Sequence, residues 1–471
     1  MQNQRRISIC GGGLGGLALA VTIGKFNPDV PIDVFEAGSA ITTTGAGVTM
    51  WKRTWQVMQR LGMDTDLAKR TVVPPADEPA LGMTFRKANM PNGGYTFFEQ
   101  VVPYGKIGLH RADLLDVLVN HLPKSCTVHL NKRLTHYTTS TNDHTGISAN
   151  EARPVTLHFS DGTTAAADVL IGADGIRSPT RKTLFQHLAK ERNDECLLAF
   201  GEPVWSGAIA YRYLIPREDL DKVWPNHRVL ERGLTYCGKN KHLVAYTVSQ
   251  GKYINVAAFD TKRELEGTPF PHGKWVADVP TQEAVDAYSG FEPEAMALLQ
   301  LMKVPSRWAV HVLKPTTHWV NGNVAILGDA SHAMRPCFGT GAGSAIEDAY
   351  ILGRLLALPS SRSHPIPKLL KTYERVRVPL ANELLVGARL TGFLYDFTHE
   401  GYADGSEGSA SYVARHESAN GGHGKTEEEV MKRHGEAIRD KWNKVHFTTT
   451  PDDDWREAEG LLAAGFATAK M

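Results

Sequence analysis

The sequence contains few cysteines, and they follow no pattern. Five occur in 471 residues, an odd number without the paired spacings of a disulfide framework or a zinc site. The protein is therefore expected to be cytoplasmic, in a reducing compartment, and to bind no metal. The five are Cys10, Cys126, Cys196, Cys237 and Cys337.

An excess of charge and a long apolar run are also missing. Lysine and arginine number 52 against 51 for aspartate and glutamate, so the net charge of +1 gives no general attraction to nucleic acid or to an anionic membrane. No stretch of 18 or more apolar residues occurs, which argues against a transmembrane helix. The chain also has no G-x-S-x-G nucleophile elbow and no internal repeat.

Glycine, in contrast, is gathered into short motifs. Near the start, Gly11, Gly13 and Gly16 form a G-x-G-x-x-G pattern between a strand-like run at 6–10 and a helix predicted at 14–26. The first glycine permits a tight turn, the second lets the backbone approach a pyrophosphate, and the third lets helix and strand pack closely. The pattern predicts a dinucleotide at the positive end of the helix.

An acidic residue follows at the distance that dinucleotide-binding domains use. A second predicted strand, 32–35, ends at Glu36, which lies 20 residues after Gly16. A carboxylate at this place accepts hydrogen bonds from the ribose hydroxyls and disfavours a 2′-phosphate. The nucleotide is therefore expected to be FAD or NAD rather than NADP.

A second motif lies in the middle of the chain. Residues 168–181 are expected to form a buried strand, a glycine turn that contains Asp174, and a helix. Arg177 and Arg181 lie near this turn and suit a phosphate-bearing ligand.

The third motif joins a strand predicted at 323–327 to a helix through two glycine-containing turns. Asp329 lies in the first turn, and Gly341 and Ala342 lie where the helix begins. Free backbone N–H groups at such a helix start stabilise an anion. His332 is expected to tie the turn together rather than to act as a base.

The three motifs, in this order and at this separation, resemble those of the FAD-dependent aromatic hydroxylases, the family of salicylate hydroxylase and 4-hydroxybenzoate hydroxylase. The resemblance covers residues 5–380 and is closest to the salicylate hydroxylase branch, including fungal members. It implies an α/β fold with a Rossmann-like FAD-binding domain, a β-sheet substrate domain and a C-terminal helical part. It also implies that Asp329 binds the ribityl chain and that Asp174 lies where flavin and nicotinamide nucleotide meet.

Smaller matches to the family add cofactor contacts by resemblance. Ala46 and Gly47 resemble the loop that lies against the adenosine and the flavin. Arg111 resembles an arginine near the FAD phosphates, where a planar guanidinium binds oxygens in pairs. The resemblance places the turn at Gly341 and Ala342 beside the isoalloxazine, whose reduced form is an anion.

The residues that bind the substrate are expected in a β-rich region. Segments 206–215, 242–249 and 253–259 alternate like strands. By resemblance to fungal members, Arg212 holds the phenolate or carboxylate of the substrate, and Tyr246 supplies a second polar contact. Four other residues fit a pocket wall as well as they fit the core: Met50, Trp51, His311 and Cys337.

The domains are expected to be discontinuous in sequence. The FAD-binding domain is assigned to residues 1–75, 101–190 and 305–365, and the substrate domain to 76–100 and 191–304. The remainder, 366–471, is expected to hold a long helix at 366–394, a mobile Gly/Ser-rich loop at 401–424, a charged helix at 427–442 and a tail.

The resemblance implies a monooxygenase. NADH or NADPH reduces FAD, O2 adds to give a C4a-hydroperoxide, and one oxygen passes to a phenol or hydroxybenzoate, with or without loss of a carboxylate. The partners are then a small aromatic substrate, O2 and NAD(P)H, and the enzyme is a monomer or homodimer. The alternative is a flavin-dependent epoxidase or dearomatising hydroxylase of secondary metabolism. A halogenase is disfavoured because the W-x-W-x-I-P segment is absent.

Overall fold

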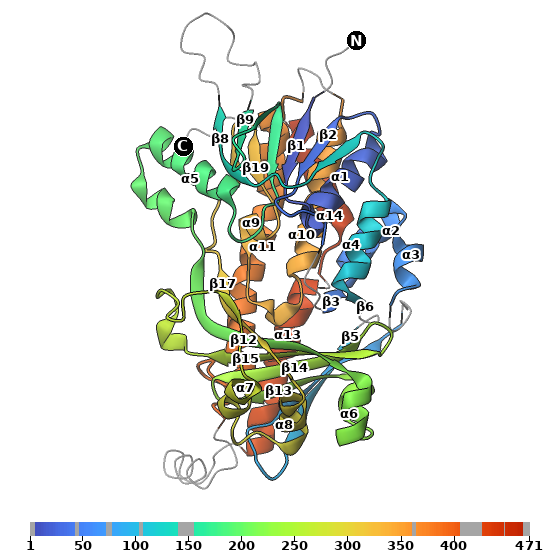
Figure 1. The fold of residues 1–471 in the computed structure, drawn as a ribbon, viewed down its shortest axis with the longest axis vertical. Helices are drawn as coiled ribbons and strands as arrows, with labels where there is room; N and C mark the ends of the chain where they lie inside the picture. Colours follow the sequence, from blue (N-terminus) through green and yellow to red (C-terminus); the bar gives the residue numbers. More distant parts are fainter. Residues whose placement is uncertain are drawn as a thin grey trace, which may run out of the picture.

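Two β-sheets lie at opposite ends of an elongated molecule, with long helices between them (Figure 1). The helix α11 (Ile366–Tyr395) runs from the six-stranded sheet toward the eight-stranded sheet, beside α10 (Gly341–Ala357). This computed structural model describes residues 5–42, 47–71, 78–102, 107–139, 155–359, 364–405, 426–446 and 448–464.

The six-stranded sheet is built around three parallel strands that carry the glycine motifs. β1 (Ile7–Cys10) pairs with β11 (Val169–Gly172), and β11 pairs with β19 (Val324–Ile326), all in parallel. These strands are buried, as in a parallel sheet that helices cover. Because parallel strands end at the same edge, the segments that follow them meet there. Across the sheet the order is β18 (Val320–Asn321), β19, β11, β1, β2 (Ile32–Phe35) and β7 (Cys126–His129).

The eight-stranded sheet forms the other end of the molecule. Helices α7 (Thr281–Ala287) and α8 (Pro293–Gln300) cover one of its faces and share a hydrophobic core with it. Only β13 and β4 pair in parallel. The strand order is β16 (Val276–Asp278), β17 (Ser306–Val312), β12 (Val204–Pro216), β15 (Tyr253–Thr261), β14 (Lys241–Val248), β13 (Gly233–Gly238), β4 (Ala80–Lys87) and β5 (Tyr95–Val102).

One domain boundary differs from the sequence expectation. β17 pairs with β12 over seven residues, so 306–312 belong to the eight-stranded sheet. The boundary at 305 puts them in the FAD-binding domain, which this pairing contradicts. One strand that crosses from one sheet to the other does not change the local amino-acid composition, so the sequence does not show where this boundary lies.

Smaller elements fill the space beside and between the two sheets. β3 (Gly47–Met50) and β6 (Ile107–His110) form a two-stranded ribbon, and β8 (Leu134–Thr139), β9 (Val155–Phe159) and β10 (Thr164–Ala167) form a three-stranded sheet. The other helices are α1 (Leu14–Phe26), α2 (Lys52–Leu61), α3 (Asp64–Ala68), α4 (Arg111–Asn120), α5 (Pro179–Arg192), α6 (Arg217–Val223) and α9 (Asp329–His332). Short 3-10 helices span Glu195–Phe200, Arg228–Leu230, Arg263–Leu265 and Pro336–Phe338.

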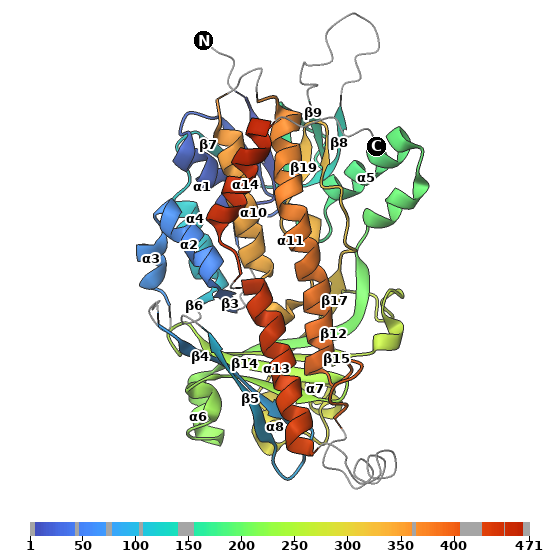
Figure 2. The same ribbon diagram turned by 180° about the vertical axis from the view of Figure 1, so that it is seen from behind.

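Two helices follow α11 and pack along it (Figure 2). α13 (Glu427–His446) reaches β5, and α14 (Pro451–Ala464) lies against α2, α10 and α11. The sequence analysis treats this last part as a tail, which is wrong, because α14 is a docked helix. Most of the predicted mobile loop at 401–424 lies outside the described residues. None of the described helices is long and apolar enough to cross a membrane.

Candidate active site

The three glycine motifs meet at one edge of the six-stranded sheet. The Ala173 amide donates to the Cys10 carbonyl at 2.8 Å, and the Leu327 amide donates to the Gly172 carbonyl at 3.0 Å. Gly11 has φ +113°, and a Cβ there would lie 2.2 Å from the Ala173 oxygen. Only glycine permits this contact between the first and the middle motif.

Two helix starts at this edge face open space. A Cβ added to Gly13, at the start of α1, or to Gly341, the first residue of α10, would have no protein atom within 4 Å. Gly16 differs, because its Cβ would lie 2.0 Å from the Gly11 oxygen. The space beside the two N-termini therefore suits an anionic ligand such as a pyrophosphate or a reduced flavin.

This difference gives a direct test of the pyrophosphate position. Gly13 has φ −80° and ψ −175°, which alanine adopts without strain, so we expect Gly13→Ala to fold with unchanged or slightly raised stability. If the pyrophosphate lies against Gly13, the new methyl group weakens FAD binding roughly tenfold or more. Thermal unfolding of the apoprotein and FAD titration measure the two effects.

Gly16→Ala is the contrasting variant. It should lose the fold as well as the cofactor, because its Cβ would clash with the backbone of the turn. A Gly13→Ala protein with normal FAD affinity would show that the pyrophosphate lies elsewhere.

The three acids of the motifs have different surroundings. Glu36 accepts hydrogen bonds from the amides of Gly12 at 2.8 Å and Gly38 at 2.7 Å, which holds its carboxylate beside the first turn. Asp329 is exposed and makes no hydrogen bond or ion pair with the rest of the described chain. A ligand can therefore reach Asp329 without breaking a protein contact.

The Asp174 carboxylate is half satisfied. One of its oxygens, Oδ2, accepts hydrogen bonds from the amide and hydroxyl of Thr180 at 3.1 and 2.6 Å. The other, Oδ1, is buried and has no partner among the described residues. Burial raises the pKa of this carboxyl. An orphaned buried oxygen next to the glycine turn fits a ligand that supplies a hydroxyl or an amide.

Of the two arginines near this turn, one has a structural role. Arg181 is 2% exposed, and its guanidinium donates to the carbonyls of Gly201, Ala330 and Ile176. The expectation that it binds a phosphate is therefore wrong. Arg177 is exposed, and its guanidinium lies 4.1 Å from the centre of the Trp275 ring.

His332 ties its turn together, as the sequence predicts. Its Nε2 lies 2.5 Å from Oδ2 of Asp348, and both residues are fully buried. The same oxygen accepts the Gly328 amide at 3.2 Å. Asp348 and Glu347 on α10 are both buried, because cations on other elements pair with them.

Arg212 and Tyr246 lie on the same face of the eight-stranded sheet. β15 separates their strands, and its Ala257 is opposite Arg212 on one side and Val244 on the other. Tyr246 is two residues beyond Val244, so its side chain projects from the same face. The neighbours of Arg212 along β12 project from the opposite face.

This face carries small side chains next to Arg212. Ala257 and Arg212 are only half-buried although they lie on central strands, and Ala210 is next to them. The Arg212 guanidinium lies 5.4 Å from the centre of the Trp308 ring, which forms a side wall. Trp308 belongs to no motif, and only the strand register shows that it belongs to this face.

The residues predicted to bind the substrate lie next to those predicted to bind the cofactor. A Cβ on Gly47 would lie 2.9 Å from the Tyr246 hydroxyl, which hydrogen-bonds to Thr49 on the same β3 strand. Burial raises the pKa of Tyr246. Burial also lowers the pKa of Arg212, and the nearby Arg111 lowers it further. Ala46, the other predicted residue of this loop, lies outside the described residues.

The four residues with an ambiguous sequence signal lie mostly in packed surroundings. Met50 and Trp51 are 2% and 5% exposed, and His311 stacks on Trp275 with ring centres 3.5 Å apart. Burial raises the pKa of the Cys337 thiol to about 12. These contacts are those of core residues.

Three glycine turns that meet at one edge of a parallel sheet are typical of a protein that binds a dinucleotide such as FAD. Comparison with known proteins identifies its family. A family model described as an FAD binding domain matches residues 5–201 and 274–388. The chain belongs to the family of FAD-dependent monooxygenases that includes salicylate hydroxylase, as its motifs predict.

Individual relatives are similar over most of their length. Salicylate hydroxylase of Pseudomonas putida is 32% identical over 396 residues, which cover 83% of this chain and 86% of that protein. The 6-methylsalicylate 1-monooxygenase of Aspergillus terreus is 29% identical over 86% of this chain and 85% of its own. A solved salicylate hydroxylase substrate complex has a TM-score of 0.76 and 27% identity, covering 97% and 98% of the two chains. These likenesses confirm the predicted α/β fold.

Proposed function

We propose that the protein hydroxylates a small aromatic acid or phenol at the expense of NADH or NADPH and O2. The observation that carries this proposal is Arg212, a half-buried arginine with no carboxylate partner among the described residues. Arg111, also without such a partner, is close enough to depress its pKa. Two neighbouring arginines without a carboxylate partner among the described residues favour the binding of an anionic ligand.

FAD fits the residues at the sheet edge. The amides at Gly13 and Gly341 face open space, Asp174 offers an unpartnered oxygen, and Asp329 is free to accept hydrogen bonds from a ribityl chain. Glu36 is held beside the first turn, where it can receive the ribose hydroxyls. When bound and reduced, FAD supplies the activation of O2.

The protein positions the substrate against this cofactor. Arg212 pairs with the carboxylate or phenolate, and its planar guanidinium fixes the orientation of the ring. Because burial raises the pKa of Tyr246, this hydroxyl keeps its proton at neutral pH and can donate a hydrogen bond to a substrate oxygen. Thr49 holds the Tyr246 hydroxyl in place. Ala210 and Ala257 leave room for the ring above the sheet.

The names of the relatives support an aromatic acid. They act, by their names, on salicylate, 6-methylsalicylate and 3-amino-4-hydroxybenzoate, each a ring that bears a carboxylate and a hydroxyl. In a decarboxylative form of the proposed reaction, a hydroxyl group replaces the carboxylate and CO2 is released.

NADH and NADPH oxidation by the purified holoenzyme tests the proposal. The panel contains hydroxybenzoates, the matching phenols without a carboxylate, and bulky prenylated or acylated phenols, and both CO2 and product mass are followed. We expect a hydroxybenzoate to stimulate oxidation most, with one oxygen atom added per nucleotide consumed. If only neutral bulky phenols or alkenes gain oxygen, the protein is the alternative epoxidase or dearomatising hydroxylase, and the anion-binding role of Arg212 is wrong.

A further inference from the structure

A buried network of charged side chains connects α2, α10, α11 and α14. Arg377 is fully buried on α11, and its guanidinium contacts Asp348 at 2.8 Å, Asp454 at 2.6 Å and Glu347 at 3.5 Å. Burial alone lowers the pKa of Arg377, but these three carboxylates raise it above its ordinary value. A single arginine on α11 thus joins α10 of the FAD-binding domain to the C-terminal helix α14.

A second arginine closes the network. Arg53, on α2, lies 3.1 Å from Glu347 and 2.7 Å from Asp454, and its side chain is 5% exposed. Asp454 is therefore shared by two buried arginines from two different helices. It is the only carboxylate that α14 contributes to this network within the described residues. Without it, two buried cations face two carboxylates that already have other partners.

The network leads directly to the flavin motif. Asp348, which Arg377 holds through Oδ1, receives the Gly328 amide and the His332 ring on Oδ2. These contacts fix the turn that presents Asp329. On the other branch, Glu347 lies on α10, whose first turn begins at Gly341. One branch of the network therefore ends at the turn that presents Asp329, and the other ends on the helix whose first turn begins at Gly341.

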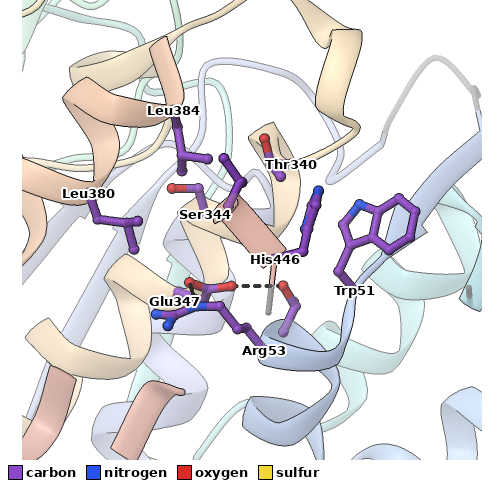
Figure 3. Close-up of a pocket in the computed structure, with 10 residues that line it drawn as sticks. Trp51, Arg53, Thr340, Ser344, Glu347, Leu380, Leu384 and His446 are labelled. Carbon is purple, nitrogen blue, oxygen red and sulfur yellow. Dashed lines mark hydrogen bonds and ion pairs between the residues drawn. The ribbon is translucent and has the colours of Figure 1, made fainter. Parts of the chain in front are cut away.

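The packing beside this network is incomplete. A small cavity separates Arg53 and Glu347 from the first turn of α10, where Thr340 and Ser344 line it (Figure 3). The Ser344 hydroxyl is buried and has no partner among the described residues. Because a cavity gives its lining room to shift, a displaced Arg53 or Glu347 can move without a clash and carry α10 with it.

We propose that α14 is a component of the FAD site, in which Asp454 acts as a positioning residue, so that docking of α14 and binding of FAD strengthen each other. Figure 2 shows α14 beside α10 and α11. By thermodynamic linkage, the factor by which docked α14 strengthens FAD binding equals the factor by which FAD strengthens docking. The proposal depends on FAD binding alone and not on the substrate.

The first experiment compares two aspartates of the same helix turn. Asp454→Asn removes the shared charge, and Asp452→Asn is the matched control, because Asp452 pairs with Arg60 at a partly exposed site. FAD affinity is measured by flavin fluorescence at a temperature where both apoproteins are folded by circular dichroism. We expect a tenfold or greater rise in Kd for Asp454→Asn and less than twofold for Asp452→Asn, with recovery in Asp454→Glu.

The second experiment tests the reverse direction on the unmodified protein. Amide hydrogen exchange of α14 is measured with and without FAD and with no substrate present. We expect FAD to slow exchange in α14 by at least tenfold and to leave the distant helix α6 unchanged. In Asp454→Asn this protection should shrink by the factor found for Kd.

Two outcomes would overturn the proposal. One is an Asp454→Asn protein whose FAD affinity matches the control. The other is α14 exchange that FAD does not alter, which would make the network a structural support alone. Neither readout involves hydroxylation, so both are independent of the substrate panel.

Discussion

Asp329→Ala should purify as a colourless protein. The Asp329 carboxylate is exposed, has no partner in the described chain and begins the short helix α9 at the sheet edge where the three motifs meet. Hydrogen bonds to a charged group are worth about 1.5 to 3 kcal/mol, so the loss of one to the ribityl chain weakens FAD binding about 10- to 150-fold. The visible spectrum after purification and an FAD titration measure the loss.

The stability of the apoprotein provides the control for this variant. Because the exposed Asp329 carboxylate makes no hydrogen bond or ion pair with the described residues, its removal should change the free energy of unfolding by less than about 0.5 kcal/mol. Asp329→Asn keeps the size and removes the charge, and we expect an intermediate affinity. A yellow Asp329→Ala protein with normal affinity would place the ribityl chain elsewhere.

Arg212→Ala should have the opposite phenotype, a yellow enzyme without substrate-stimulated turnover. Its guanidinium lies on the face of the second sheet, close enough to Arg111 of the predicted cofactor set to be affected by its charge. Removing one partner of a buried charge pair costs about 2 to 5 kcal/mol, which corresponds to a fall in kcat/KM of about 30- to 5,000-fold. NADH oxidation with and without the best hydroxybenzoate measures it.

Arg307→Ala is the matched control for that experiment. Arg307 lies on the adjacent strand β17, opposite Tyr211, and its guanidinium donates to Glu283 at 2.9 Å on the face that α7 covers. It should bind FAD and substrate normally, with some loss of stability. Arg212→Ala would argue against the proposed roles if it lost its flavin, or if it kept full turnover.

The parts of the fold that depend on local sequence could be predicted. The helix at 14–26 and the strand at 32–35 have the predicted bounds, because a glycine turn separates two clear apolar patterns. The strands at 206–215 and 253–259 were predicted too. The first extends by one or two residues at both ends, and the second extends by two residues at its end, because strand pairing continues there. β13 was missed, since the four residues between its terminal glycines show little alternation.

The missed helix α14 did leave a signal. The Thr450 hydroxyl accepts the Asp453 amide at 3.3 Å, while the Asp453 carboxylate accepts the Thr450 amide at 2.7 Å, a reciprocal cap that the sequence T-x-x-D encodes. Where this helix docks was not predictable. Arg53 and Asp454 are about 400 residues apart, and neither lies in a motif that points to the other.

For the candidate site, the motifs predicted where residues lie in the fold better than they predicted which groups those residues contact. The glycines of the first and third motifs lie at the expected edge, because each follows a buried strand. Arg181 was misassigned, since a sequence cannot distinguish an arginine that binds phosphate from one that binds three carbonyls. Which face of a strand carries Trp308 depends on register, which long-range pairing decides.

The order of the parallel strands also bears on how the chain folds during synthesis. β1 pairs with β11, about 160 residues later, and β11 pairs with β19 after a similar interval. At about 5 to 20 residues per second, β1 leaves the ribosome some 10 to 30 s before β11 exists, although β2 can pair with its other edge much sooner. The edge that pairs with β11 must wait, and α14 is made last of the described elements. Cofactor loading is therefore a late event, and a chain released early leaves the glycine turn without its neighbours.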